Sequence, residues 1–106
     1  MLITSTFDIA DKTIVKTLGL VKGNTIRARH VGRDIMAGLR GIVGGEPHEY
    51  TKLLAESREQ ALDRMIEDAE KLGADAVVGV SFSTSVMSQG AAELMAYGTA
   101  VLIEDK

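Results

Sequence analysis

The sequence predicts an α+β fold, a two-layer subunit in which one long helix packs on an antiparallel sheet. Three observations favour this class. A helical stripe of apolar residues extends over residues 50–72, two strand-like segments follow it between residues 76 and 103, and another precedes it at residues 13–21. With 106 residues, 45% of them hydrophobic and 25% charged, the chain is expected to form a single domain over residues 1–106.

The first strand is expected over residues 13–21, where β-branched and aliphatic side chains are frequent. Gly23 and Asn24 follow it, and this pair is typical of turns. We therefore expect the pair to end the strand, with residues 25–31 either extending it or pairing with it.

A short additional helix is expected between residues 32 and 43, because apolar side chains recur there at helical spacing. Gly44 and Gly45 end it. Pro47 suits the first turn of a following helix, which has no use for the missing N–H. The apolar positions of the short helix are Ile35, Leu39, Ile42 and Val43.

The long helix is the clearest element of the sequence. Its apolar residues keep to one stripe for about six turns, and charged residues fill the opposite face. Gly73 can adopt the left-handed conformation that commonly ends a helix. The stripe consists of Tyr50, Leu53, Leu54, Ala61, Leu62, Met65, Ala69 and Leu72.

Residues 76–86 and 93–103 are expected to be two antiparallel strands joined by a polar turn at residues 87–90. Alternation along the first of them predicts one apolar face and one small, polar face. The apolar face is expected to contain Val78, Val80, Phe82 and Val86, and the other face Val77, Gly79, Ser81, Ser83 and Ser85.

The second strand of this hairpin is apolar on both faces, which is unusual for a two-layer monomer. A single layer of helices covers only one face of a sheet, so the other face is expected to meet another subunit. The alternative is that the short helix of residues 32–43 covers it within the same chain. The residues expected at a subunit interface are Ser81, Ser83, Ser85 and Tyr97.

Composition and charge exclude several classes of function. No cysteine is present, so disulfides and thiolate ligands are excluded, and a cytoplasmic location is expected. A formal net charge of −3 gives no basic surface for nucleic acid, and no segment is long and apolar enough to span a membrane. No nucleotide-binding fingerprint occurs, and a serine nucleophile would need a base from histidines that are distant in sequence. The protein is therefore not expected to be an enzyme.

Three short segments resemble the YbjQ-like family of small prokaryotic proteins. They are RGIVGGE at residues 40–46, GADAVVGV at residues 73–80 and AYGTAV at residues 96–101. The resemblance covers nearly the whole chain. It implies a dodecin-like β-α-β-β subunit, with a long helix on an antiparallel sheet, that assembles as a ring-shaped homopentamer. It also implies the heavy-metal binding for which the family is described.

A divalent metal ion would need nitrogen and oxygen ligands here, because thiolates are absent. The candidate ligands are His30 and, at the start of the long helix, Glu46, His48 and Glu49. The alternative for this cluster is helix capping, in which carboxylates accept hydrogen bonds from free N–H groups and complement the helix dipole. In a ring, symmetry could also bring copies of one histidine or glutamate together.

Arg27, Arg29, His30 and Arg33 form the only local basic cluster, next to Gly32 and the start of the short helix, and its arginines Arg27, Arg29 and Arg33 are the candidate anion ligands. Arginines, a glycine and a helix N-terminus together are typical of an anion site. The alternative is pairing between subunits with the carboxylates of the long helix, since opposite charges commonly set the orientation of an interface.

The sequence thus predicts a cytoplasmic homo-oligomer, a pentamer by resemblance, that binds a metal ion or another small ligand at its subunit interfaces without catalysis. The alternative is a structural or partner-recruiting oligomer that holds no small ligand. Nucleic acid and membranes are not expected partners.

Overall fold

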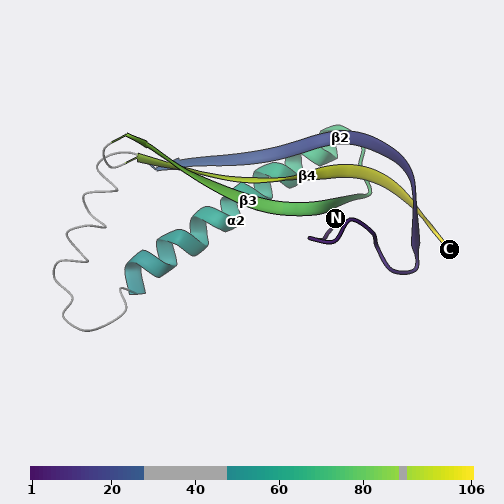
Figure 1. The fold of residues 1–106 in the computed structure, drawn as a ribbon, viewed down its shortest axis with the longest axis horizontal. Helices are drawn as coiled ribbons and strands as arrows, with labels where there is room; N and C mark the ends of the chain where they lie inside the picture. The colour runs from purple at the N-terminus through teal and green to yellow at the C-terminus, as the bar shows by residue number, and fades with distance from the viewer. Residues whose placement is uncertain (28–47, 89–90) are drawn as a thin grey trace.

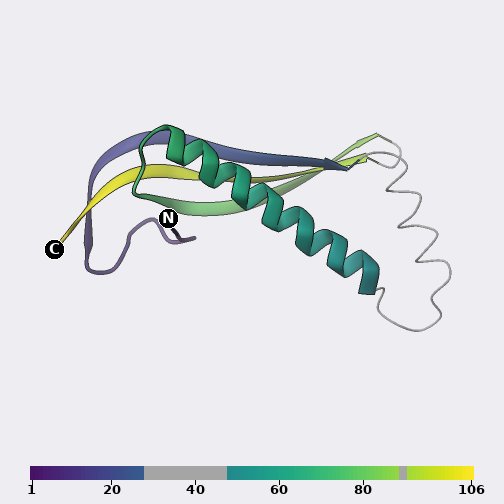
Figure 2. The same ribbon diagram turned by 180° about the vertical axis from the view of Figure 1, so that it is seen from behind.

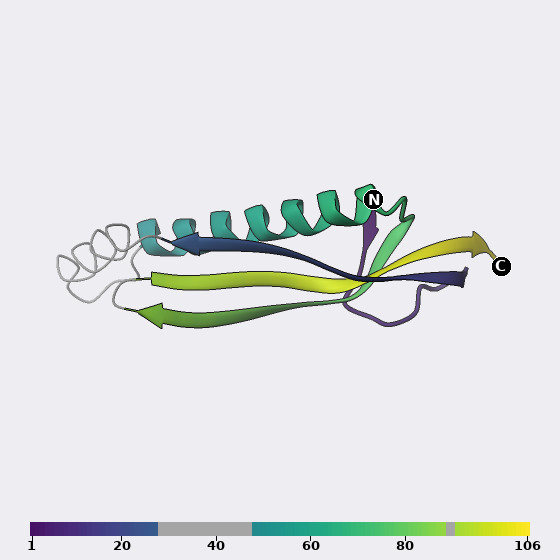
Figure 3. The ribbon, with the colours of Figure 1, turned by 90° about the horizontal axis from the view of Figure 1, so that it is seen from above.

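The computed structural model describes residues 1–27, 48–88 and 91–106. They form two layers, a four-stranded sheet in the order β1-β3-β4-β2 and one helix, α2, on one of its faces (Figures 1 and 3). The predicted α+β class is confirmed, while the short helix expected at residues 32–43 lies outside the described residues. The elements are β1 (Leu2–Ile3), β2 (Lys12–Arg27), α2 (His48–Lys71), β3 (Ala76–Ser88) and β4 (Ala91–Asp105).

The sheet is mixed, which corrects the prediction of a purely antiparallel one. β4 is antiparallel to both of its neighbours, β2 and β3, but the two-residue strand β1 pairs in parallel with Ala76 and Val77 of β3. The chain then continues beside β3, where Gly79 N–H donates to the Thr6 carbonyl at 2.8 Å and Val80 N–H donates to the Thr4 carbonyl at 3.0 Å. A strand of two residues is too short to show alternation in a sequence.

Strand β2 continues through Gly23 and Asn24, so the turn predicted there is wrong. A Cβ atom on Gly23 would lie 2.2 Å from the backbone oxygen of Ala61 in α2. Glycine is needed at this position because the helix backbone rests on the strand, a requirement of tertiary packing that local sequence does not show. Of the two interpretations of residues 25–31, the extension of the strand is correct as far as Arg27.

Helix α2 packs through the predicted stripe. Ala61, Met65 and Ala69 of this stripe are fully buried. The helix ends in the expected way at Gly73, which has a φ of 77°. Gly73 N–H donates to the Glu70 carbonyl at 3.0 Å and Ala74 N–H to the Ala69 carbonyl at 3.1 Å, the pair of bonds that defines a Schellman motif.

A bulge in β3 changes the predicted distribution of its side chains. Between Val78 and Ser81 the strand contains one residue more than its partner β4, and Gly79 within the bulge has a φ of 63°. The extra residue puts Val77 on the helix side with Val80, and leaves Val78 on the opposite side. Simple alternation had predicted the reverse for Val77.

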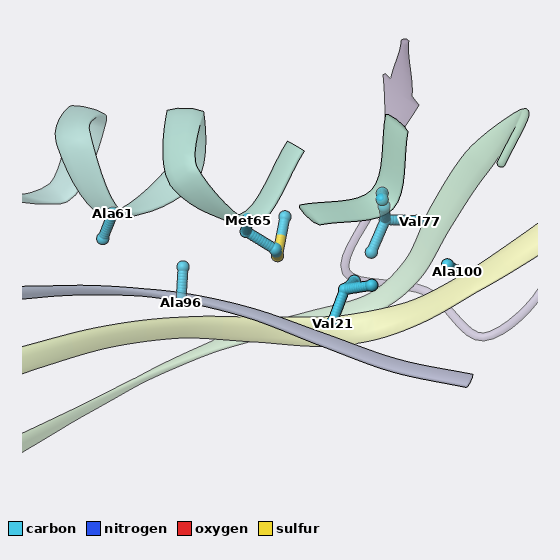
Figure 4. Close-up of a cluster of buried hydrophobic side chains, with 7 residues drawn as sticks. Val21, Ala61, Met65, Val77, Ala96 and Ala100 are labelled. Carbon is cyan, nitrogen blue, oxygen red and sulfur yellow. The ribbon is translucent and has the colours of Figure 1, made fainter. Parts of the chain in front are cut away.

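Two apolar clusters lie on opposite faces of the sheet. The larger one joins α2 to β2, β3 and β4, and its members Ala61 and Met65 point from the helix toward the strands (Figure 4). The smaller cluster consists of Ala76, Val78 and Val101, with Ile9, Ile14 and Ile103 packed against it. Since Ile9 precedes β2, the N-terminal segment itself covers this part of the second face, a cover that the sequence analysis did not foresee.

Candidate interface on the open face of the sheet

The second face of the sheet carries three rows of side chains beyond the smaller cluster. Strand register places each row across β2, β4 and β3 in that order. We call these residues, together with Leu20 and Thr99, the open face, because α2 packs on the opposite side (Figure 2). The rows are Lys22–Tyr97–Ser81, Asn24–Met95–Ser83 and Glu93–Ser85, with Glu93 opposite Ile26 of β2 in the register.

The open face is chemically mixed and partly shielded from water. Tyr97, Met95 and Ser83 are half-buried, whereas Ser81 and Ser85 are exposed. Asn24 Nδ2 donates to Glu93 Oε2 at 3.0 Å in a part-buried hydrogen bond between neighbouring rows. Leu20 lies at the margin with 68% of its surface exposed. Aromatic, thioether, amide and hydroxyl groups in such proximity can bind another surface by both apolar contact and hydrogen bonding.

The four residues expected at a subunit interface therefore lie together. Ser81 stands directly opposite Tyr97 in the β3–β4 pairing, and Ser83 and Ser85 continue along the same face. Sequence reasoning missed Lys22 and Asn24, which β2 adds to this surface. Continuing the strand alternation past Gly23, instead of ending it there, would have found both.

The side chains predicted to bind a metal or an anion all lie outside the part of the chain whose side chains the structure describes. His30 and Glu46 lie outside the described residues, as do Arg29 and Arg33. His48 and Glu49 begin α2 and Arg27 ends β2, but the structure describes only their backbone. Helix capping and metal binding at the start of α2 therefore both stay predictions.

Within one chain, the described residues do not fit a metal ion. Among the side chains that the structure describes, no group of three histidine, aspartate or glutamate residues comes together. Soft heavy metals favour thiolates, and the chain has no cysteine. A search of the same residues for a helix long and apolar enough to cross a membrane finds none.

The fold defines a class of protein, a small two-layer α+β domain in which, among the described residues, one helix covers one face of a four-stranded sheet. The chain belongs to the YbjQ family, whose description is "Putative heavy-metal-binding" and whose sequence profile matches residues 1–104. This confirms the family resemblance expected from the three segments.

Relatives of the same length occur in archaea and bacteria. A "UPF0145 protein" of Methanosarcina acetivorans is 59% identical over 100% of both chains. A protein of Dehalococcoides mccartyi with the same designation is 58% identical over 98% of this chain and 100% of its own. A crystal structure of a Pediococcus pentosaceus protein of unknown function, assigned to the DUF74 family, superimposes with a TM-score of 0.65. It covers 98% of each chain at 18% identity, a likeness that supports the fold alone.

Proposed function

We propose that the protein is a non-enzymatic binding protein, a homo-oligomeric ring of five copies that holds a metal ion or another small ligand where subunits meet. The observation that carries this proposal is the open face. Tyr97 and three serines form a surface suited to contact, next to an exposed Leu20, on the side of the sheet opposite its helix. Covering this face with another copy completes the second layer that a sheet needs.

A ligand between subunits agrees with the donor groups of the chain. Among the described side chains of one copy no three ligating groups meet, and a site between subunits would combine groups from several copies. A ring repeats each candidate around its axis, so His30, Glu46, His48 and Glu49 would each be present five times. The same holds for Arg27, Arg29 and Arg33 as an anion site. The family description favours the metal over the anion.

Elemental analysis of the purified protein, followed by calorimetric titration with Zn²⁺, tests the ligand. We expect stoichiometric metal, and we expect the combined variant His30→Ala, Glu46→Gln, His48→Ala and Glu49→Gln to bind at least tenfold more weakly. The matched control is Arg27→Gln, Arg29→Gln and Arg33→Gln, which should leave Zn²⁺ binding unchanged. Equal loss in both variants, or unchanged binding in the first, would reject the metal assignment.

The second candidate is a structural or partner-recruiting oligomer without a small ligand. Two observations favour it, the lack of a three-residue metal cluster among the described residues and the mixed aromatic and polar chemistry of the open face. It predicts that the assembled protein contains no metal and no bound phosphate after purification. Metal in fixed ratio to the subunit would exclude this candidate.

A further inference from the structure

One row of the open face consists of three hydrogen-bond donors. Lys22 of β2 stands opposite Tyr97 of β4, and Tyr97 stands opposite Ser81 of β3. Residues directly opposite each other on antiparallel strands have Cβ atoms about 5 Å apart and share one face of the sheet. An ammonium, a phenol and an aliphatic hydroxyl therefore project from neighbouring positions, within reach of one small molecule.

The polar groups of this row have no protein partner within the described part of the chain. No hydrogen bond or ion pair there uses the Lys22 ammonium, the Tyr97 hydroxyl or the Ser81 hydroxyl. Asp68 of α2 bonds to the backbone N–H of Lys22 at 3.2 Å, and not to its ammonium. Tyr97, at the centre of the row, is half-buried, and a tyrosine hydroxyl in such a position usually has a hydrogen-bond partner. The donors of this row are therefore available to a ligand.

The charges of the open face favour a small anion at this row. Lys22 is the one cation among the residues of the open face, and its ammonium can make a charge-assisted hydrogen bond to an oxyanion. The one carboxylate of the same face, Glu93, accepts a hydrogen bond from Asn24 and lies four residues from Tyr97 along β4, about 13 Å away. A polyanion such as nucleic acid is disfavoured by the net charge of −3.

We propose that the Lys22–Tyr97–Ser81 row binds a small oxyanion, a carboxylate or a phosphate. Lys22 supplies the charge, and the hydroxyls of Tyr97 and Ser81 donate to the remaining oxygens of the ligand. The site is formed by side chains of one copy, so it goes beyond the proposed function and does not depend on the ring. In an assembly that covers the open face, the anion would lie between copies.

NMR titration at constant ionic strength tests the site, with inorganic phosphate in one series and acetate in the other. We expect saturable shifts of the Lys22, Tyr97 and Ser81 amides in at least one series, and the series that saturates identifies the ligand as a phosphate or a carboxylate. Lys22→Gln should weaken binding at least fivefold and Tyr97→Phe at least twofold. Lys16→Gln is the matched control, because Lys16 is an exposed lysine of the same strand whose partner across β4 is Leu102, and it should leave the affinity unchanged.

Two results would overturn the site. One is the absence of a saturable shift at these amides with either anion, and the other is equal weakening by Lys22→Gln and Lys16→Gln, which would mean that the anion only screens surface charge. Native mass spectrometry of the same samples separates this inference from the proposed function. A pentamer that binds neither anion would overturn the site alone, whereas a monomer that binds one of them through Lys22 would support the site and overturn the ring.

Discussion

The two faces of the sheet are built from the same three strands but differ in the size and polarity of their side chains. On the helix face, Gly23, Ala96 and Gly98 keep side chains small, and a Cβ atom on Gly98 would lie 2.7 Å from Val77 Cγ1. On the open face, the alternate residues of the same strands are larger and mostly polar, among them Lys22 and Tyr97. Close packing on the helix face therefore specifies the fold. The side chains of the open face are not constrained by α2 and can contact another molecule.

The largest effect is expected where the helix face is tightest. Gly23→Val places a branched side chain against the backbone of Ala61 and Met65, which cannot withdraw without moving α2. We expect the free energy of unfolding to fall by about 3 kcal/mol, the upper range for overpacking. Urea unfolding at fixed protein concentration measures it, and Val15→Thr, an exposed site on the same strand, should change it by less than about 0.5 kcal/mol. Equal values for the two variants would mean that α2 does not rest on β2 at Gly23.

A smaller effect is expected at the outer edge of β2, where Lys22 N–H donates to Asp68 Oδ2 of α2 at 3.2 Å. Asp68→Ala removes the acceptor of Lys22 N–H, and we expect a loss of about 1 kcal/mol of stability together with faster hydrogen exchange at the Lys22 amide. Asp68→Asn keeps an acceptor oxygen and should lose less than half as much. Unchanged exchange at Lys22 in Asp68→Ala would show that the helix does not close this edge.

The smallest effect is expected at the Lys12–Asp105 ion pair, which belongs to neither face. The hydrogen bond from Lys12, together with its charge, lowers the pKa of Asp105 below its ordinary value of 3.8. A folded-state pKa below the unfolded one gives stability that is present above pH 3.8 and is lost as pH falls through the folded value. NMR titration should show the pKa of Asp105 rising toward 3.8 in Lys12→Ala, with little change in stability because Asp105 is exposed. A pKa unaffected by this substitution would mean that the pair does not form in solution.

The elements governed by local pattern were predictable from the sequence. The stripe of α2 and its end at Gly73 follow from helical periodicity and C-cap chemistry, and the hairpin of β3 and β4 follows from two apolar runs around a polar turn. The joint placement of Ser81, Ser83 and Ser85 on one face also followed, because strand alternation beyond the bulge is regular.

The elements governed by contacts distant in sequence were not predictable. Gly23 resembled a turn residue because the helix that requires it lies about 40 positions further along the chain. The bulge at Gly79 changed the face of Val77, and β1 was too short to form a pattern. For the candidate site, the same limits hid Lys22 and Asn24, which only the full length of β2 brings beside Tyr97 and Met95.

The most direct test of the central claim, that the sheet is completed by other copies of the chain, is native mass spectrometry of the wild-type protein at micromolar concentration. We predict a single assembly of five times the 11.3 kDa subunit mass. A species of 11.3 kDa alone would contradict the claim, because the open face would then be stable in water without a partner.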